Sequence, residues 1–231
     1  MTTDETQQNH FTVAYDELRS QFMGQNKLLD AVLPPGIFMI VNSLWGLQAA
    51  LFTAVGTAAV FSAVRLMRRE KLWFSLSGLL SVFVAAGFAW WMSRAEGFFL
   101  PSILSNTALV LISLLSVLLK KPLMAWISHY SRGWPRAWYW HPRVRPAYGE
   151  VTLVWVILMA VRLVVQLFLY TSHRVNALGV FQIITGTPAT VVLLVLSYLY
   201  GAWRLKRLHG PSVQEYQNGD PPPWQGQQRG F

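Results

Sequence analysis

The segment VTLVWVILMAVRLVVQLFLY, residues 151–170, decides the fold class of this chain. It is apolar over about 20 residues, the length that an α-helix needs to cross the hydrocarbon core of a bilayer. It also contains Arg162, and Gln166 follows one helical turn later on the same face. A guanidinium near the middle of a membrane costs at least about 2.5–3.5 kcal/mol on insertion scales. We therefore predict a transmembrane helix whose arginine needs a compensating partner.

The composition of the whole chain is that of a membrane protein. Its 231 residues are 53% hydrophobic and 13% charged, whereas about a quarter of a soluble domain is charged. The net charge is +9, but the basic residues occur in short clusters beside apolar runs. This distribution favours the positive-inside rule and contact with anionic headgroups over nucleic-acid binding. The chain has no cysteine, which excludes disulfides, thiolate metal ligands and a cysteine nucleophile.

Six apolar segments predict an all-α bundle of about six transmembrane helices within a domain that covers residues 28–207. Their residues are 28–44, 48–64, 73–92, 101–119, 151–170 and 177–200. Basic clusters follow the second, fourth and sixth segments, and the other links are short, which predicts both termini on the cytoplasmic side. The first segment contains Pro34 and Pro35 and either spans or re-enters the membrane. Gly186 and Pro188 predict a kink in the sixth segment.

The two ends of the chain are polar. Residues 1–27 predict a cytoplasmic tail without a cleaved signal peptide, because no basic region precedes an apolar core. From Phe11 onward this tail reads equally well as a short amphipathic surface helix or as a frayed linker. Residues 208–231 are rich in Gln, Pro and Gly, which predicts a disordered cytoplasmic tail.

Several polar side chains fall inside the predicted spans. The fourth span carries a stripe at helical spacing that should point into the bundle, formed by Ser102, Asn106, Ser113 and Ser116. The predicted partner of Arg162 is Glu96, which follows Arg94 in the short link after the third span, with help from Asn106 or Gln166. Such a pair either locks the bundle, as buried polar groups commonly do, or marks a solute path or an anion site at Arg162.

Basic and aromatic residues alternate in the link between the fourth and fifth spans. This pattern predicts a lipid-facing interfacial segment that rests on anionic headgroups. Its residues are Arg132, Trp134, Arg136, Trp138 and Trp140. A platform for single-stranded nucleic acid uses similar residue types, but the adjacent membrane spans favour the lipid interpretation.

No pattern in the sequence indicates catalysis. The histidines fall mainly in tails and loops and form no HExxH motif. Paired carboxylates, a serine elbow and a phosphate-binding glycine loop are also absent from the sequence. We therefore expect no catalytic residue, no metal site and no cofactor, and predict that the protein is not an enzyme.

Charged motifs along the chain resemble those of an uncharacterised bacterial integral-membrane family, domain of unknown function 3159 (DUF3159). The motifs are SRAEGFFLPSILSN at residues 93–106, Arg65-Leu66 with Arg68-Arg69, Lys121-Pro122-Leu123, Val161-Arg162-Leu163 with Gln166, and Ala177-Leu178-Gly179-Val180. The resemblance covers about residues 28–207 and implies a multi-spanning plasma-membrane protein of unestablished activity. More distantly, LLDAVLP and KKPL are similar to the septation protein A (YciB-type) inner-membrane family, which is linked to envelope synthesis and division.

Two functions fit these patterns, both in the bacterial cytoplasmic membrane. The first is a small-solute transporter or channel-like permease with Arg162 in or beside its path. The second is a membrane scaffold or regulator of cell-envelope and septation proteins, which would dock membrane-protein partners on the basic aromatic segment. Transporters often contain two related halves, and the sequence shows no convincing internal repeat.

Overall fold

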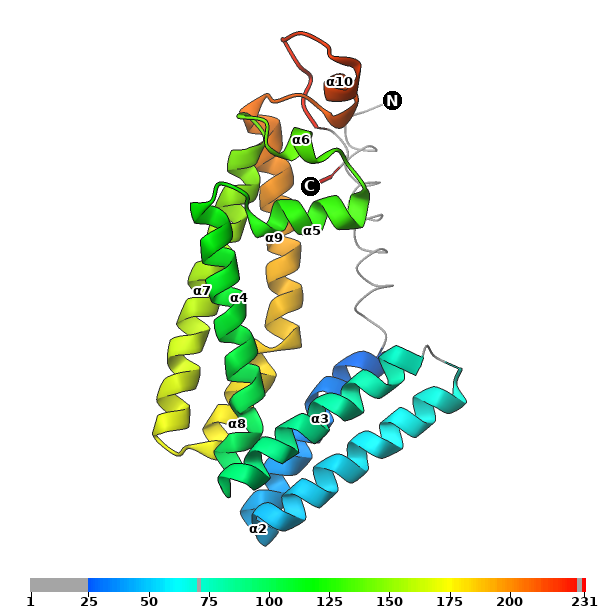
Figure 1. The fold of residues 1–231 in the computed structure, drawn as a ribbon, viewed down its shortest axis with the longest axis vertical. Helices are drawn as coiled ribbons and strands as arrows, with labels where there is room; N and C mark the ends of the chain where they lie inside the picture. The colour runs from blue at the N-terminus through cyan, green and yellow to red at the C-terminus, as the bar shows by residue number, and fades with distance from the viewer. Residues whose placement is uncertain (1–24, 70–71, 228–229) are drawn as a thin grey trace. The chain divides into compact units, whose positions relative to one another are not determined.

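The computed structural model describes residues 25–69, 72–227 and 230–231, with side chains from Leu33 onward except Phe74. The described residues are predominantly helical and contain no strand (Figure 1). They divide into two compact units, which are described separately below. The first consists of the described part of Met1–Pro101 together with Leu169–Val191, and the second of Ser102–Phe168 and Val192–Phe231. The predicted N-terminal tail lies mostly outside the described residues.

The first unit begins with α2, Gln25–Met67, which is interrupted at Gly46. Gly46 has φ 82° and ψ 178°, a backbone conformation that essentially only glycine adopts. The break lies in the predicted link between residues 44 and 48. Helix α3, Leu72–Met92, follows and packs along α2.

Small and aromatic side chains form the core of the first unit. Ala50, Ala54 and Ala89 are fully buried, and their small size allows α2 and α3 to approach closely. The short helix η1, Ala95–Phe99, inserts aromatic rings into this core. Phe98 stacks on Phe38 with ring centroids 4.1 Å apart. Helix α8, Val175–Thr185, also packs on α2.

The second unit contains most of three long helices: α4, Leu100–Leu118; α7, Arg145–Thr171; and α9, Thr187–Leu208. Val151, Trp155 and Met159 form one of its cores, and the Trp155 indole donates a hydrogen bond to Ser197 Oγ at 2.8 Å. Of the predicted polar stripe on α4, Asn106 and Ser113 are buried, whereas Ser102 and Ser116 are only partly buried. The stripe therefore faces the protein mainly at two of its four positions.

Two short helices replace the predicted interfacial segment: α5, Leu123–Arg132, and α6, Arg136–Tyr139. Trp138 is fully buried, and its indole donates a hydrogen bond to the Pro211 carbonyl at 2.8 Å. The prediction that Trp138 faces lipid is therefore wrong. Alternation of basic and aromatic residues does not specify which rings the fold buries, and here Trp138 forms a core with Tyr139 and Tyr148.

The C-terminal segment also differs from its prediction, because part of residues 208–231 is ordered. Helix α10, Val213–Asn218, begins with a capping box in which Ser212 Oγ accepts from the Glu215 amide and the Glu215 carboxylate accepts from the Ser212 amide. Phe231 stacks on Tyr148 with ring centroids 4.3 Å apart. A polar composition indicates disorder only when nothing anchors the segment, and here the cap and the aromatic residue provide anchors.

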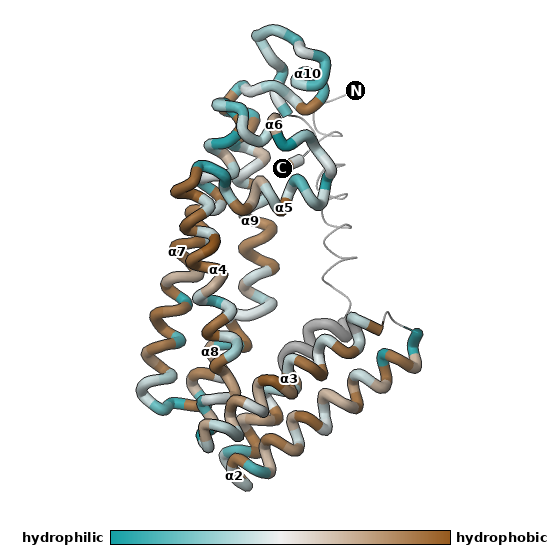
Figure 2. The backbone as a smooth tube through the Cα atoms, viewed as in Figure 1, coloured by the Kyte–Doolittle hydropathy of each residue, from teal (hydrophilic) through white to brown (hydrophobic). Residues whose placement is uncertain are grey.

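Among the residues that the structure describes, five helical stretches are long and apolar enough to cross a membrane. They are Leu33–Met67, Ser75–Met92, Ala95–Leu118, Arg145–Thr171 and Val175–Leu208. Large apolar side chains such as Phe52 (81% exposed) and Trp90 (75% exposed) lie on their surfaces, as expected where lipid replaces water. Figure 2 shows hydrophobic residues along these helices and hydrophilic residues around α5, α6 and α10. The chain is thus a helical membrane protein.

The count of six spans is not confirmed, because the first two predicted spans fall in the single stretch of α2. The predicted kink in the last span is confirmed. Helices α8 and α9 are separated at Gly186, whose ψ of −126° is not helical. Pro188 then lies in the first turn of α9, where its missing N–H leaves no helical bond unmade.

Candidate functional site

The candidate site lies between α4 and α7 in the second unit, where two amide side chains meet inside apolar helices. Asn106 Nδ2 donates to Gln166 Oε1 at 3.0 Å and to the Met159 carbonyl at 3.3 Å. Gln166 is fully buried and Asn106 is 6% exposed. A helix produces this arrangement readily, because Met159 and Gln166 are seven residues apart and therefore share a face of α7. The structure thus brings together two of the predicted intramembrane residues.

Arg162 lies one turn before Gln166 on α7 and is half-buried. Its Nε atom and the Nε2 atom of Gln166 are both buried, and neither has a hydrogen-bond partner among the described residues. Buried polar groups in native proteins are almost always paired. Two unpaired donors on one face of one helix therefore mark a position where an acceptor is expected.

The predicted partner of Arg162 has a different contact within its own unit. Glu96 in η1 is buried, and its Oε1 lies 3.2 Å from Nδ1 of His173, which follows α7. Arg94, its neighbour, is exposed. Arg162 belongs to the second unit and Glu96 to the first, so the pair between them stays a prediction. The contact of Glu96 with His173 was not predicted from the sequence.

A second polar contact missed from sequence links α7 and α9. Arg204 donates from Nε and from its terminal nitrogen to the two oxygens of Glu150, both at 2.7 Å, and Tyr200 donates to the same carboxylate at 2.8 Å. This is the bidentate geometry that makes arginine–carboxylate pairs strong. The sequence held a usable signal, because Glu150 precedes the fifth predicted span and Arg204 follows the sixth, so both fall at the same end of the bundle.

The other residues of the predicted interfacial segment lie on or near the surface of α5 and α6. Arg132 and Arg136 are exposed, and Trp134 and Trp140 are half-buried. The Arg132 guanidinium lies 5.0 Å from the centre of the Trp134 ring, and that of Arg136 lies 5.7 Å from Trp126. These cation–π contacts hold two positive charges at the surface. Their predicted contact with lipid stays a prediction.

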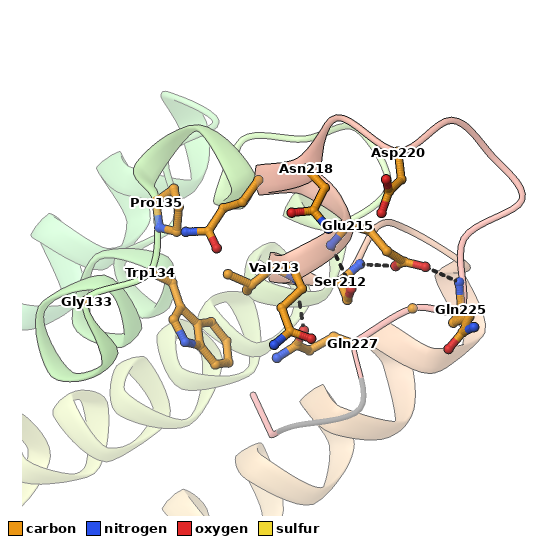
Figure 3. A pocket seen from close by; sticks show the side chains of 13 residues that line it. Gly133, Trp134, Pro135, Ser212, Val213, Glu215, Asn218, Asp220, Gln225 and Gln227 are labelled. Carbon is orange, nitrogen blue, oxygen red and sulfur yellow. Dashed lines mark hydrogen bonds between the residues drawn. The ribbon is translucent and has the colours of Figure 1, made fainter.

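A pocket of about 570 Å³ opens beside α10 (Figure 3). Its walls include Trp134 and several side-chain amides, among them Gln227. Its lining contains two carboxylates, Glu215 and Asp220. Both oxygens of Glu215 already accept hydrogen bonds, from the backbone amides of Ser212 and Gln225. The backbone hydrogen bond from Gln225 is the largest cause that lowers the pKa of Glu215 below its usual value. This carboxylate therefore holds the loop together, and it has little capacity left for a ligand.

A family model described as a protein of unknown function (DUF3159) matches residues 22–207. The chain belongs to this family. No curated protein and no solved structure matches it, so the similarity to septation protein A is not shown.

Proposed function

We propose that this DUF3159 protein is a small-solute permease of the bacterial cytoplasmic membrane whose solute site is formed by Asn106, Gln166 and Arg162. The observation that carries the proposal is a pair of buried nitrogen donors on α7, Arg162 Nε and Gln166 Nε2, that have no hydrogen-bond partner in the described part of the chain. If these side chains only stabilised the packing of the bundle, their donors would be expected to form hydrogen bonds with neighbouring helices. A polar residue inside membrane helices is by default a candidate for a solute path.

The proposed topology places both termini and the basic clusters on the cytoplasmic side. It rests on the positive-inside rule applied to Arg68, Lys120 and Arg207, which follow α2, follow α4 and end α9 respectively. The short turn that contains His173 then faces the outside. No chemical reaction forms part of the proposal.

The chain has no cysteine, so single cysteines can test whether water reaches the site. Asn106→Cys, Arg162→Cys and Gln166→Cys would each be treated in intact cells with a small membrane-impermeant thiol reagent, after expression and folding have been checked. The permease predicts rapid labelling at these positions. Arg94→Cys, in the exposed turn, is the positive control, and Ala54→Cys, fully buried between apolar helices, is the negative control.

If Arg94→Cys reacts while all three site positions stay unlabelled, the interior is dry and the permease proposal fails. The alternative is then a scaffold or regulator that docks envelope proteins on α5 and α6. The exposed guanidiniums of Arg132 and Arg136, held on indole rings, favour this second function. Replacing both arginines by glutamine should then remove captured membrane-protein partners, and an unchanged set of partners would refute the scaffold.

A further inference from the structure

We infer that the ligand of the α4–α7 site is an oxyanion, a carboxylate or phosphate group that accepts hydrogen bonds from Arg162 and Gln166. This inference deepens the proposed function and rests on the same site. Both unpaired buried atoms are N–H donors. A ligand that offered only further donors would leave them unpaired, so the ligand must provide acceptor atoms.

The orientation of the amides follows from geometry. The Met159 carbonyl can only accept, so the Asn106 atom that faces it is the nitrogen Nδ2. The same nitrogen reaches Gln166, so Gln166 must present its oxygen to Asn106. Nε2 of Gln166 is therefore the atom that has no partner among the described residues. Asn106 acts as a positioning residue that holds the oxygen of Gln166 and so directs the buried Nε2 donor away from itself.

The surrounding helices cannot neutralise Arg162 themselves. Helices α4, α7 and α9 together contain one carboxylate, Glu150. Glu150 lies about 18 Å from Arg162 along α7, at 1.5 Å per residue, and both of its oxygens are bound to Arg204. A neutral carbonyl ligand would satisfy the hydrogen bonds but not the charge, whereas an oxyanion satisfies both. Arginine also binds carboxylate and phosphate through two donors at once.

Equilibrium binding to the purified full-length protein tests the inference. The melting temperature would be measured in neutral detergent while sodium acetate, or in a second series sodium phosphate, replaces sodium chloride at constant pH and ionic strength. A bound anion raises the melting temperature in a saturable way. We expect this response from the wild type, and an apparent affinity weakened by about tenfold or more in Arg162→Lys and Gln166→Leu, the loss of one hydrogen bond to a charged group. Arg174→Gln, an exposed arginine before α8, is the matched control and should respond like the wild type.

A variant that is expected to raise the melting temperature keeps the inference testable if the Arg162 variants do not fold. Gln166→Glu places a carboxylate one turn after Arg162 and so supplies the missing acceptor within the chain. It should melt at a higher temperature than the wild type without acetate, and should no longer respond to it. If Gln166→Glu melts lower and responds as the wild type does, the inference is wrong.

Two further arms identify the source of the oxyanion. If one phosphatidylglycerol co-purifies with the wild type and is lost from Arg162→Lys, the oxyanion is a lipid phosphate; an acetate or phosphate response without retained lipid indicates a free solute. Absence of any response and of retained lipid overturns the inference. It is also overturned if Glu96→Gln and Arg162→Gln lower the melting temperature non-additively, because the acceptor is then the chain's own carboxylate.

Uptake of labelled acetate into phosphatidylglycerol proteoliposomes separates this inference from the permease. Binding of acetate without uptake refutes the permease and leaves the oxyanion site. Uptake of an uncharged solute such as glycerol, together with no response to acetate or phosphate and no retained lipid, supports a permease and refutes the oxyanion.

Discussion

Arg204 and Glu150 form a bidentate ion pair, with two N–O distances of 2.7 Å, between α9 and the start of α7. The two side chains are about one-third exposed, so solvent screens their attraction in part. The planar guanidinium still matches the carboxylate at both oxygens, and Tyr200 adds a third hydrogen bond. The pair joins residues that are 54 positions apart in sequence and therefore fixes the register of α7 against α9.

This ion pair predicts energetic coupling in a double-mutant cycle. Glu150→Gln and Arg204→Gln should each destabilise the protein, and their combined effect should be smaller than the sum of the two single effects. Arg204→Lys should behave like Arg204→Gln, because lysine lacks the planar guanidinium that donates to both carboxylate oxygens at once. The measurement is the free energy of unfolding in mixed micelles. Additive effects would mean that the ion pair contributes no coupling energy to the stability of the protein.

The hydrogen bond between Asn106 and Gln166 should contribute about 0.6 kcal/mol and at most about 1.7 kcal/mol, the average and the maximum found for side-chain pairs in membrane helices. A cycle with Asn106→Leu and Gln166→Leu measures it. Asn106→Leu combined with Ser197→Ala is the control cycle, because Ser197 bonds to Trp155 instead, and the two effects should add within about 0.5 kcal/mol. A coupling energy of equal size in both cycles would contradict a specific hydrogen bond between Asn106 and Gln166.

Trp138→Phe should destabilise the protein by about 1–3 kcal/mol. The change keeps an aromatic ring but leaves the Pro211 carbonyl without the indole donor in a buried position. Trp90→Phe, at a position that is 75% exposed, should change the free energy of unfolding by less than about 0.5 kcal/mol. Similar effects at the two positions would place Trp138 on the surface, as the sequence alone predicted.

The imidazole of His141, between α6 and α7, should make the protein less stable in mild acid. Burial lowers the pKa of His141 below its ordinary value of 6.5, and Arg143 lowers it further. The unfolded chain then binds more protons than the folded chain once the pH falls below about 6.5, so stability decreases from there down to the folded pKa. His141→Asn should reduce the fall in melting temperature between about pH 7.5 and 5.5. An unchanged fall would assign the acid sensitivity to other groups.

Ser212→Ala should destabilise α10 without changing the stability of the membrane helices. The substitution removes the side-chain acceptor of the Glu215 amide, a loss of about 1 kcal/mol for an N-cap. Hydrogen exchange at the amides of Glu215 and Tyr216 should accelerate about fivefold, the rate change that 1 kcal/mol produces. Ser131→Ala, on the exposed side of α5, should leave these amides unchanged, and equal acceleration in both variants would refute the cap.

Much of the architecture could be predicted from the sequence because bilayer thickness fixes how long an apolar helix must be. The helices α3, α4 and α7, the break near Gly46 and the kink at Gly186 all fall where apolar runs, glycine and proline indicate them. The family was also readable, because charged motifs such as Arg162 with Gln166 are rare inside apolar helices. Asn106 and Gln166 were expected inside the bundle for the same reason.

The contacts of individual polar side chains could not be predicted in this way. Periodicity places Asn106 on an inward face, but only the packing of α4 on α7 gives it Gln166 and Met159 as acceptors. The same limit explains Trp138, whose burial depends on the Pro211 carbonyl 73 residues later. The ordered C-terminal segment depends likewise on the stacking of Phe231 on Tyr148.

The sequence by itself therefore determined that this is a helical membrane protein of the DUF3159 family, because hydrophobic length and local charge act on each segment separately. Only the tertiary structure decided which donors have no partner among the described residues. That property depends on every neighbour of Arg162 and Gln166 at once, since a buried N–H is free only if no acceptor from any helix lies within hydrogen-bond distance.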